Sequence, residues 1–282
     1  MLRGKDGDMG TTLKPAKIDP SFFAPRDDTV VTWLGMAGAL INTRGTILFI
    51  DPLLAVTRRD GKGFADSGDR LIIPLPIEAG EVPRADAVLY THADGDHFGP
   101  ATALDLAARL KPQFVAPQRV LRLIEALGIG QERLVTASEG QSIRIGSAEV
   151  IVTPALHDYE QPEPFRREDC CGYLIKTPDG AIWHPGDTRL IDDLLAIKEV
   201  DVLFFDVAAV EAHLGPEGSA RLAQSSGAQV MVAYHYGTFD LPPGTWGSCD
   251  PEDARPYISG LAAHFWLPNP GELLHLPLCE AR

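Results

Sequence analysis

From residue 29 onward, short apolar runs alternate with turns that are rich in glycine, proline and charged residues. Apolar runs bounded in this way are typical of buried β-strands. The predicted strands are Val30–Leu34, Ala39–Asn42, Thr46–Ile50, Ala87–Thr91, Gln141–Ile145, Ala148–Thr153, Gly172–Thr177, Ala181–Trp183, Val202–Phe205, Val230–Ala233 and Glu272–Leu276.

Other segments carry helix signals. In Ala101–Leu110 and Arg119–Leu127 apolar residues recur at three- and four-residue spacing, as on one face of a helix. The segment Pro216–Ser226 begins with a proline, which favours the first turn of a helix. A last helix is predicted near Pro251–Ala263, and residues 55–82, with their charges, glycines and prolines, are predicted to form a long surface loop.

Strands followed by helices occur in both halves of the chain. This order favours an α/β fold in which two sheets pack together with helices outside them. No clear linker separates the halves, so we predict a single domain at residues 29–282. Residues 1–28 are polar and are predicted to form a leader or a surface arm.

The composition limits the partners. The chain has 282 residues and is 45% hydrophobic, so it can bury a sizeable core. Its formal net charge of −14 works against nucleic acid or an anionic membrane as a partner, because both would repel it. A small anionic substrate stays open, since bound divalent ions invert the local field. We therefore expect a small-molecule substrate, and the sequence leaves the oligomeric state open, a homo-oligomer included.

The sequence also bears on the compartment. No stretch approaches the roughly 18 apolar residues that span a bilayer, and no apolar run follows the polar N-terminus as in a signal peptide. Four cysteines lack the spacing of a zinc knuckle or of a secreted disulfide framework. We expect a cytoplasmic protein with structural, reduced cysteines at Cys170, Cys171, Cys249 and Cys279.

The segment Thr91–His97 carries the densest set of metal-binding side chains. Two histidines and two aspartates follow an apolar strand within these residues. A helix cannot aim all four side chains at one point, whereas a tight loop at a strand end can. Imidazole and carboxylate are ligands of zinc, manganese and iron. The alternative is a polar loop whose aspartates cap a helix near Ala101, although capping accounts for at most one of them.

Three more candidates stand just past apolar runs downstream, namely His157, Asp187 and His235. Taken alone, each is more often a structural residue than a metal ligand. Loops that follow different strands can converge, so the three together with the Thr91–His97 segment favour a metal site.

In this order, the motifs resemble the metallo-β-lactamase superfamily, and within it most closely the branch of ascorbate-6-phosphate lactonase and its relatives. The resemblance runs from about Val30 to Leu276 and implies an αββα sandwich with the site at one edge. It rests on Thr32-Trp33-Leu34-Gly35, Ile50-Asp51-Pro52, His92-x-x-x-Asp96-His97, His157, Gly186-Asp187-Thr188 and His235-Tyr236-Gly237-Thr238.

The resemblance also implies two divalent metal ions, Zn²⁺ or Mn²⁺, with iron as a further candidate. Asp187 would bridge both ions. The other implied ligands are His92, Asp94 and His157 for the first ion and Asp96, His97 and His235 for the second.

Two positions depart from the family pattern. Asp94 stands where the family has a histidine, and Met36 stands where it often has another. We expect Asp94 to bind the first ion and to make that site richer in oxygen. The alternative is that the first ion binds weakly or is absent. No role is assigned to Met36.

Such a pair of ions lowers the pKa of a shared water and polarises the bond under attack. The resemblance thus implies a metal-dependent hydrolase that attacks with a metal-bound hydroxide, with Asp96 and Asp187 as catalytic residues. The expected substrate is a lactone or other small cyclic ester or amide. A phosphodiesterase of the same fold and a non-catalytic metal-binding or ligand-sensing protein are the alternatives, because fold alone does not fix the reaction.

Several residues near these motifs have open roles. Asp51 either supports the metal loop or forms a strand-end turn. His184 is expected to be structural, while His213 either lines the site or precedes a helix. The candidate substrate contacts are Tyr159, Tyr236, Arg166, Arg167 and Arg189.

Overall fold

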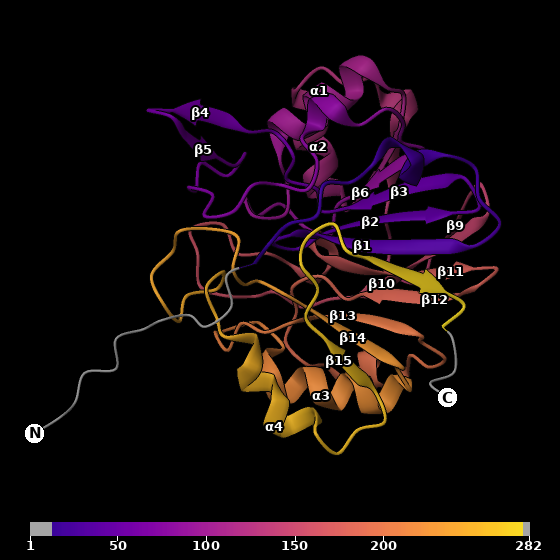
Figure 1. Ribbon diagram of the computed structural model, residues 1–282, viewed down its shortest axis with the longest axis vertical. Helices are drawn as coiled ribbons and strands as arrows, with labels where there is room; N and C mark the ends of the chain where they lie inside the picture. The colour runs from indigo at the N-terminus through magenta and orange to yellow at the C-terminus, as the bar shows by residue number, and fades with distance from the viewer. Residues whose placement is uncertain (1–12, 279–282) are drawn as a thin grey trace, which may run out of the picture.

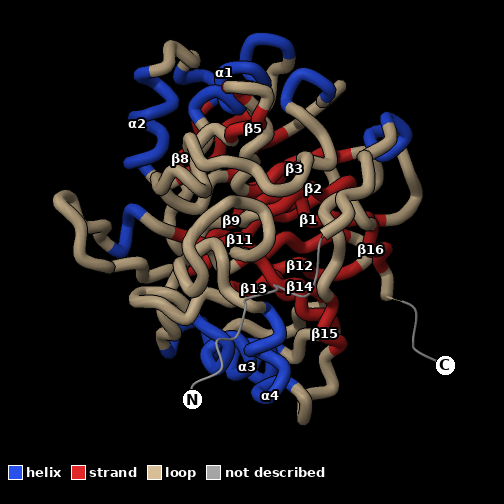
Figure 2. The backbone as a smooth tube through the Cα atoms, turned by 60° about the vertical axis from the view of Figure 1, so that its left-hand side comes forward, coloured by secondary structure: helices blue, strands red, loops and turns tan. Residues whose placement is uncertain are grey.

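The computed structural model describes residues 13–278. Two large sheets pack face to face, and helices cover the outer face of each (Figure 1). Within the described residues, one sheet has seven strands in the order β16-β1-β2-β3-β6-β7-β8, and the other has seven in the order β15-β14-β13-β12-β11-β10-β9. The predicted α/β sandwich is confirmed, and Figure 2 shows its helices at opposite ends with the strands between them.

The first half of the chain supplies most of the first sheet. Its strands are β1 (Thr29–Gly35), β2 (Gly38–Thr43), β3 (Thr46–Ile50), β6 (Ala87–Leu89), β7 (Gln113–Ala116), β8 (Leu134–Thr136) and, from the far end of the chain, β16 (Leu273–Leu276). The helices that cover it are α1 (Pro100–Arg109) and α2 (Gln118–Ala126), and a separate hairpin consists of β4 (Thr57–Arg59) and β5 (Lys62–Phe64).

The second half forms the second sheet. Its strands are β9 (Ser142–Ile145), β10 (Ala148–Pro154), β11 (Cys171–Thr177), β12 (Gly180–His184), β13 (Val202–Asp206), β14 (Val230–Tyr234) and β15 (His264–Trp266). The covering helices are α3 (Gly215–Ser226) and α4 (Arg255–Ile258). Short 3-10 helices lie at Pro20–Phe23, Ala79–Glu81, Gln131–Arg133, Arg167–Asp169, Asp192–Ala196 and Pro251–Ala254.

Large apolar side chains fill the space between the sheets. Trp33 of β1 and Trp183 of β12 are fully buried in the same cluster. A second cluster lies between the first sheet and its helices, and it includes the apolar face of α2 together with Phe49 and Phe114. Covered on both faces, β1, β2 and β3 are buried along their whole length. This rigid double layer fixes the strand ends from which the site loops project.

The structure corrects some sequence predictions. The helix predicted near Pro251–Ala263 is shorter than predicted, because the helical turns run only from Pro251 to Ile258 and the chain then returns to the sheet as β15. There His264 pairs with Val230 of β14. The segment 55–82 is not loop alone, since it contains the hairpin β4–β5. Two short strands, β7 and β8, were not predicted.

Of residues 1–28, the part from residue 13 onward packs on the domain. Ile18, Phe22 and Phe23 are buried against the first sheet, and the Ala16 amide donates to the Pro270 carbonyl at 2.8 Å. Residues 1–12 lie outside the described part. Across residues 13–278, no helix has the length and apolar character that crossing a membrane requires.

Candidate metal centre

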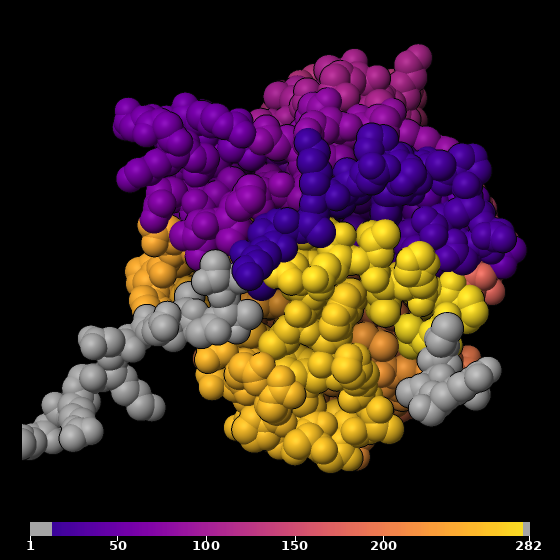
Figure 3. Space-filling view, in the orientation of Figure 1, coloured from indigo at the N-terminus to yellow at the C-terminus, as the bar shows by residue number. Residues whose placement is uncertain are grey.

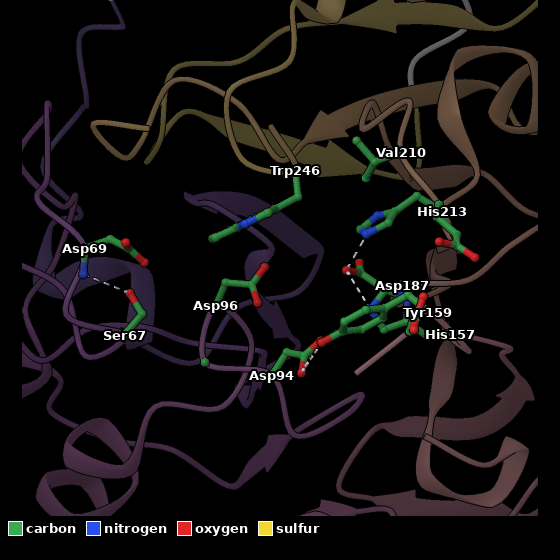
Figure 4. Close-up of a pocket in the computed structure, with 13 residues that line it drawn as sticks. Ser67, Asp69, Asp94, Asp96, His157, Tyr159, Asp187, Val210, His213 and Trp246 are labelled. Carbon is green, nitrogen blue, oxygen red and sulfur yellow. Dashed lines mark hydrogen bonds and ion pairs between the residues drawn. The ribbon is translucent and has the colours of Figure 1, made fainter. Parts of the chain in front are cut away.

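The loops that follow β6, β10, β12 and β14 meet at one edge of the sandwich, and the predicted ligands lie on them. Figure 4 shows four of these ligands: Asp94, Asp96, His157 and Asp187. Local backbone geometry fits this placement. Gly186, directly before Asp187, has a φ of +66°, and a Cβ there would lie 2.6 Å from the Cys171 carbonyl oxygen. Only glycine fits so close a turn. His235 also has a positive φ, of 67°, at the sharp turn that ends β14.

Three predicted ligands form one group, which we call the Asp94 cluster: His92, Asp94 and His157. One carboxylate oxygen of Asp94 lies 3.4 Å from His92 Nε2 and 3.3 Å from His157 Nε2. The hydroxyl of Tyr159 donates to the same carboxylate at 3.1 Å. Asp94 therefore faces the two histidines, as predicted for a metal ligand.

The remaining predicted ligands form a second group, the Asp187 cluster: Asp96, His97, Asp187 and His235. Asp96 lies 3.5 Å from Nε2 of both histidines. Asp187 lies 3.2 Å from His97 Nε2 and 3.7 Å from His235 Nε2. Asp187 also reaches to 4.0 Å from His157 of the other cluster, so its carboxylate stands between the two groups.

Each histidine is held by its outer nitrogen. Nδ1 of His97 bonds the Asp51 carboxylate at 2.8 Å, and Nδ1 of His235 bonds the Asp206 carboxylate at 2.9 Å. Nδ1 of His157 donates to the Ala212 carbonyl at 3.0 Å, and Nδ1 of His92 lies 3.0 Å from the Thr91 hydroxyl. In each ring these contacts place a proton on the outer nitrogen, so Nε2 is the nitrogen that faces inward and can bind a metal once it carries no proton.

The positions of the inward-facing Nε2 atoms suit bound metal ions better than hydrogen bonds among the histidines. His92 Nε2 is buried without a hydrogen-bond partner. Nε2 of His97 and Nε2 of His235 lie 3.2 Å apart, so when both rings are neutral with their protons on Nδ1, two lone pairs face each other at a distance that favours a cation, either a proton or a metal ion, beside them. Imidazole nitrogens with carboxylate oxygens suit zinc, manganese or iron. The residues present therefore fit two divalent ions.

The electrostatics point the same way. Burial opposes the charged form of His235, but the carboxylates of Asp187 and Asp206 outweigh it and raise its pKa to about 10. The pKa of His97 is also raised well above its usual value, because nearby carboxylates outweigh its burial. Burial and repulsion from His97 instead lower the pKa of His92. The Asp187 cluster thus strongly favours a bound positive charge.

The helix-capping alternative is wrong for Asp94. The first turn of α1 is capped by Asp66, whose carboxylate accepts from the amides of Ala101 at 3.0 Å and Thr102 at 2.7 Å. Asp66 lies far back in the sequence, in the loop after β5. The carboxylate of Asp94 is thus left to face the cavity.

Sequence reasoning missed Asp206, the last residue of β13. Its buried carboxylate is bonded by Nδ1 of both His235 and His213. Burial opposes its charged form, but these two histidines outweigh it and lower its pKa to about 2. The signal was available, because Asp206 follows an apolar run just as Asp187 does.

The open roles can now be assigned by position. Asp51 supports the metal loop, since it bonds His97 and also accepts from the Thr91 hydroxyl at 2.6 Å. His184 is structural: its Nε2 donates to the Ala37 carbonyl at 2.8 Å, and burial lowers its pKa to about 4. His213 lines the site, with Nδ1 3.7 Å from Asp187.

Both clusters open into one cavity of about 480 Å³. Of the candidate substrate contacts, Tyr159 lines it, whereas Arg167 bonds Glu139 at 2.9 Å and Arg189 bonds Asp158 at 2.6 Å outside it. Tyr236 is stacked on Trp33 with ring centroids 4.8 Å apart. The lining residues are Ser67, Asp69, Asp94, Gly95, Asp96, His157, Tyr159, Glu160, Asp187, Val210, Glu211, His213 and Trp246.

Comparison with known proteins gives consistent matches. A family model described as a beta-lactamase superfamily domain matches residues 47–236. A Pyrobaculum neutrophilum protein named UPF0173 metal-dependent hydrolase is 28% identical over 251 residues, which cover 87% of this chain and 99% of that protein.

Solved structures share the fold. Isothiocyanate hydrolase from Delia radicum gut bacteria has a TM-score of 0.68 at 18% identity, with 87% of this chain and 98% of that chain covered. Igni18, described as a novel metallo hydrolase from Ignicoccus hospitalis, has a TM-score of 0.66 at 19% identity, with coverages of 89% and 99%.

Proposed function

The chain belongs to the beta-lactamase superfamily and is a metal-dependent hydrolase, and from this premise we propose that it hydrolyses a lactone or another small cyclic ester or amide. One observation carries the proposal: inward-facing imidazole nitrogens and carboxylates, held from behind, converge on the floor of a small open cavity. That arrangement suits water-dependent cleavage of a small molecule.

In this proposal the Asp94 cluster would hold one divalent ion and the Asp187 cluster the second, with Asp187 as the residue they would share. When bound, the two ions supply an acidified water and a positive charge that polarises the bond under attack. The ions that we propose are Zn²⁺ or Mn²⁺, with iron as a further candidate.

The chain's own residues orient the reactants. Asp96 lines the cavity and is placed to accept a hydrogen bond from the attacking water. Asp206 fixes Nδ1 of His213, so the other ring nitrogen of His213 is available to bond the substrate. No further side-chain nucleophile is needed, because water supplies the attacking oxygen.

Size and charge favour a small ester over a phosphodiester. A cavity of about 480 Å³ lies in the range of small-molecule sites. Within residues 13–278, no lysine or arginine lines it, and such side chains are the usual partners of phosphate oxygens. We therefore keep the phosphodiesterase as the weaker alternative.

The test is a substrate panel on metal-loaded protein. Lactones, cyclic amides and bis-phenyl phosphates are assayed with Zn²⁺ or Mn²⁺, and bound metal is measured by elemental analysis. We expect lactone turnover that a chelator removes and added metal restores. Turnover of the phosphate diesters alone would favour the phosphodiesterase. Full metal content with no turnover on any ester would favour the non-catalytic alternative.

We also propose that the protein acts in the cytoplasm on small molecules, without nucleic acid or membrane partners. Free thiols at Cys170, Cys171 and Cys249 support this compartment, because reducing conditions keep thiols unpaired. Cys279 lies outside the described residues. Thiol titration of the denatured, unreduced protein should find all four cysteines free, and two disulfides would overturn the proposal.

A further inference from the structure

The cavity carries more negative charge than its metal ligands account for. Three further carboxylates line it, from Asp69, Glu160 and Glu211. They come from three different loops, which follow β5, β10 and β13. Figure 4 shows the Asp69 side chain directed into the cavity, on the far side from His213. We call these three residues the acidic rim.

The rim carboxylates are not neutralised by the protein. In the part of the chain that the structure describes, none of the three has an ion-pair partner within 4.0 Å. Neighbouring arginines are engaged elsewhere, since Arg70 pairs with Asp240 and Arg189 pairs with Asp158 at 2.6 Å. The rim therefore presents its charge to whatever enters the cavity.

Bound ions do not remove this excess. Two divalent ions exceed the three carboxylates that hold them (Asp94, Asp96 and Asp187) by one formal charge, whereas the rim adds three negative charges. Asp51 and Asp206 behind the ligands add more. A cleft lined by one sign of charge concentrates molecules of the opposite sign. The loaded cavity thus favours a cation at its mouth.

An aromatic side chain in the same cavity complements the rim. Trp246 lines the cavity and lies across it from Asp94 (Figure 4). Its ring centroid is 6.3 Å from that of His235, so the indole stands close to the metal centre. Tryptophan faces attract ammonium groups within about 6 Å of the ring. An indole and several carboxylates that line the same cavity are a suitable environment for an alkylammonium group.

We infer that the substrate carries a permanent or protonated ammonium group, which the acidic rim and Trp246 hold while the neighbouring ester or amide bond lies over the metal centre. This inference rests on the proposed function for the bond that is cleaved. It also weighs against a phosphorylated substrate, because the carboxylates of the acidic rim would repel a phosphate group.

The experiment compares three lactones with one ring and different side groups: trimethylammonium, its neutral tert-butyl analogue, and carboxylate. We expect kcat/KM to fall in that order. The advantage of the cation should shrink between about 10 mM and about 0.2 M salt, because the rim is partly exposed and is screened. Equal rates, or a preference for the carboxylate, would overturn the inference while leaving the hydrolase intact.

Single rim variants locate the preference. Asp69→Asn, Glu160→Gln and Glu211→Gln should each lower the ratio of cationic to neutral kcat/KM about two- to fivefold, or roughly 0.4–1 kcal/mol. Glu132→Gln is the matched control, since Glu132 is an exposed acid that does not line the cavity. A ratio unchanged in all three rim variants would show that the rim does not hold the cation.

Binding separates this inference from the hydrolase proposal. Calorimetry on metal-loaded protein compares choline with its neutral isostere 3,3-dimethylbutanol. Tighter choline binding that weakens in the rim variants supports the inference even if no lactone is cleaved, in which case the proposed function fails alone. Equal binding of both probes overturns the inference whatever the enzyme hydrolyses.

Discussion

The two halves of the metal centre are supported in different ways. In the Asp94 cluster the outer partners are neutral: a threonine hydroxyl, a carbonyl and the Tyr159 phenol. In the Asp187 cluster they are the buried carboxylates of Asp51 and Asp206. The Asp94 side chain is 22% exposed, whereas that of Asp187 is 2% exposed. A buried carboxylate behind a histidine strengthens the histidine as a ligand, so the Asp187 cluster should bind its ion first and more tightly.

The largest expected effect removes the residue that both clusters share. Asp187→Ala should reduce activity to background and lower the content of both ions, because one carboxylate stands between the two groups. Elemental analysis and circular dichroism measure metal content and folding. Asp192→Ala, at an exposed acid of a nearby 3-10 helix, should leave both unchanged. A folded Asp187→Ala protein with its full metal content would refute the shared role.

Changes behind the histidines should separate the clusters. Asp206→Asn should lower the affinity of the Asp187 cluster for its ion by about 10- to 100-fold, as loss of such a partner usually does. Tyr159→Phe removes a neutral hydrogen bond to Asp94 and should lower the affinity of the Asp94 cluster for its ion by roughly two- to tenfold. Stepwise metal titration against a chelating dye measures the metal affinities of both clusters. Equal losses in the two variants would contradict the contrast between the clusters.

Replacing the unusual ligand should act on one cluster only. Asp94→His gives the Asp94 cluster three imidazoles and should shift it from manganese toward zinc, because nitrogen ligands suit zinc better. We expect a smaller effect than that of Asp206→Asn. The premise is checked by a crystal structure soaked in manganese: carboxylate ligands lie about 2.0–2.2 Å from the ion, and Asp94 oxygens beyond about 3 Å would exclude it as a ligand.

Proton release gives the finest distinction. The pKa of His235 is raised to about 10, so at pH 8 the metal-free ring keeps its proton, which an incoming ion must displace. The pKa of His92 is lowered, so that ring is already neutral at pH 8. Filling the Asp187 cluster should therefore release at least one proton, because the pKa of His97 is raised as well, and the affinity of this cluster for its ion should rise with pH toward about 10. Calorimetry in buffers of different ionisation enthalpy measures the release, and none from the tighter site would contradict this assignment.

The sequence predicted the first half of the site better than the second. Thr91–His97 is one continuous loop, so its composition alone indicates a metal site. His157, Asp187 and His235 follow separate strands, so their place after apolar runs made each only a weak candidate, and it was the family resemblance that gave them ligand roles. Asp206 was missed because a lone acid after a strand is common, and nothing local shows that it reaches two histidines.

The fold errors have the same origin. The helix predicted at Pro251–Ala263 ends at Ile258, and the chain then enters β15, which was not predicted because its pairing with β14 is a contact between distant segments. The cap of α1 likewise comes from Asp66 and not from the adjacent loop. The local periodicity of the sequence carries no information about either contact. What the sequence did predict, the two packed sheets and their outer helices, depends on patterns that repeat in every strand and helix.

The strand β16 has a consequence for synthesis of the chain. It pairs with β1, where Thr29 lies opposite Leu276, and Figure 3 shows the C-terminal segment in contact with the N-terminal one. A nascent chain that has already produced the Thr91–His97 loop still has the edge of β1 uncovered until residue 276 leaves the ribosome. Open strand edges invite pairing with other chains. The exposure of this strand edge should therefore end only with the docking of this four-residue strand.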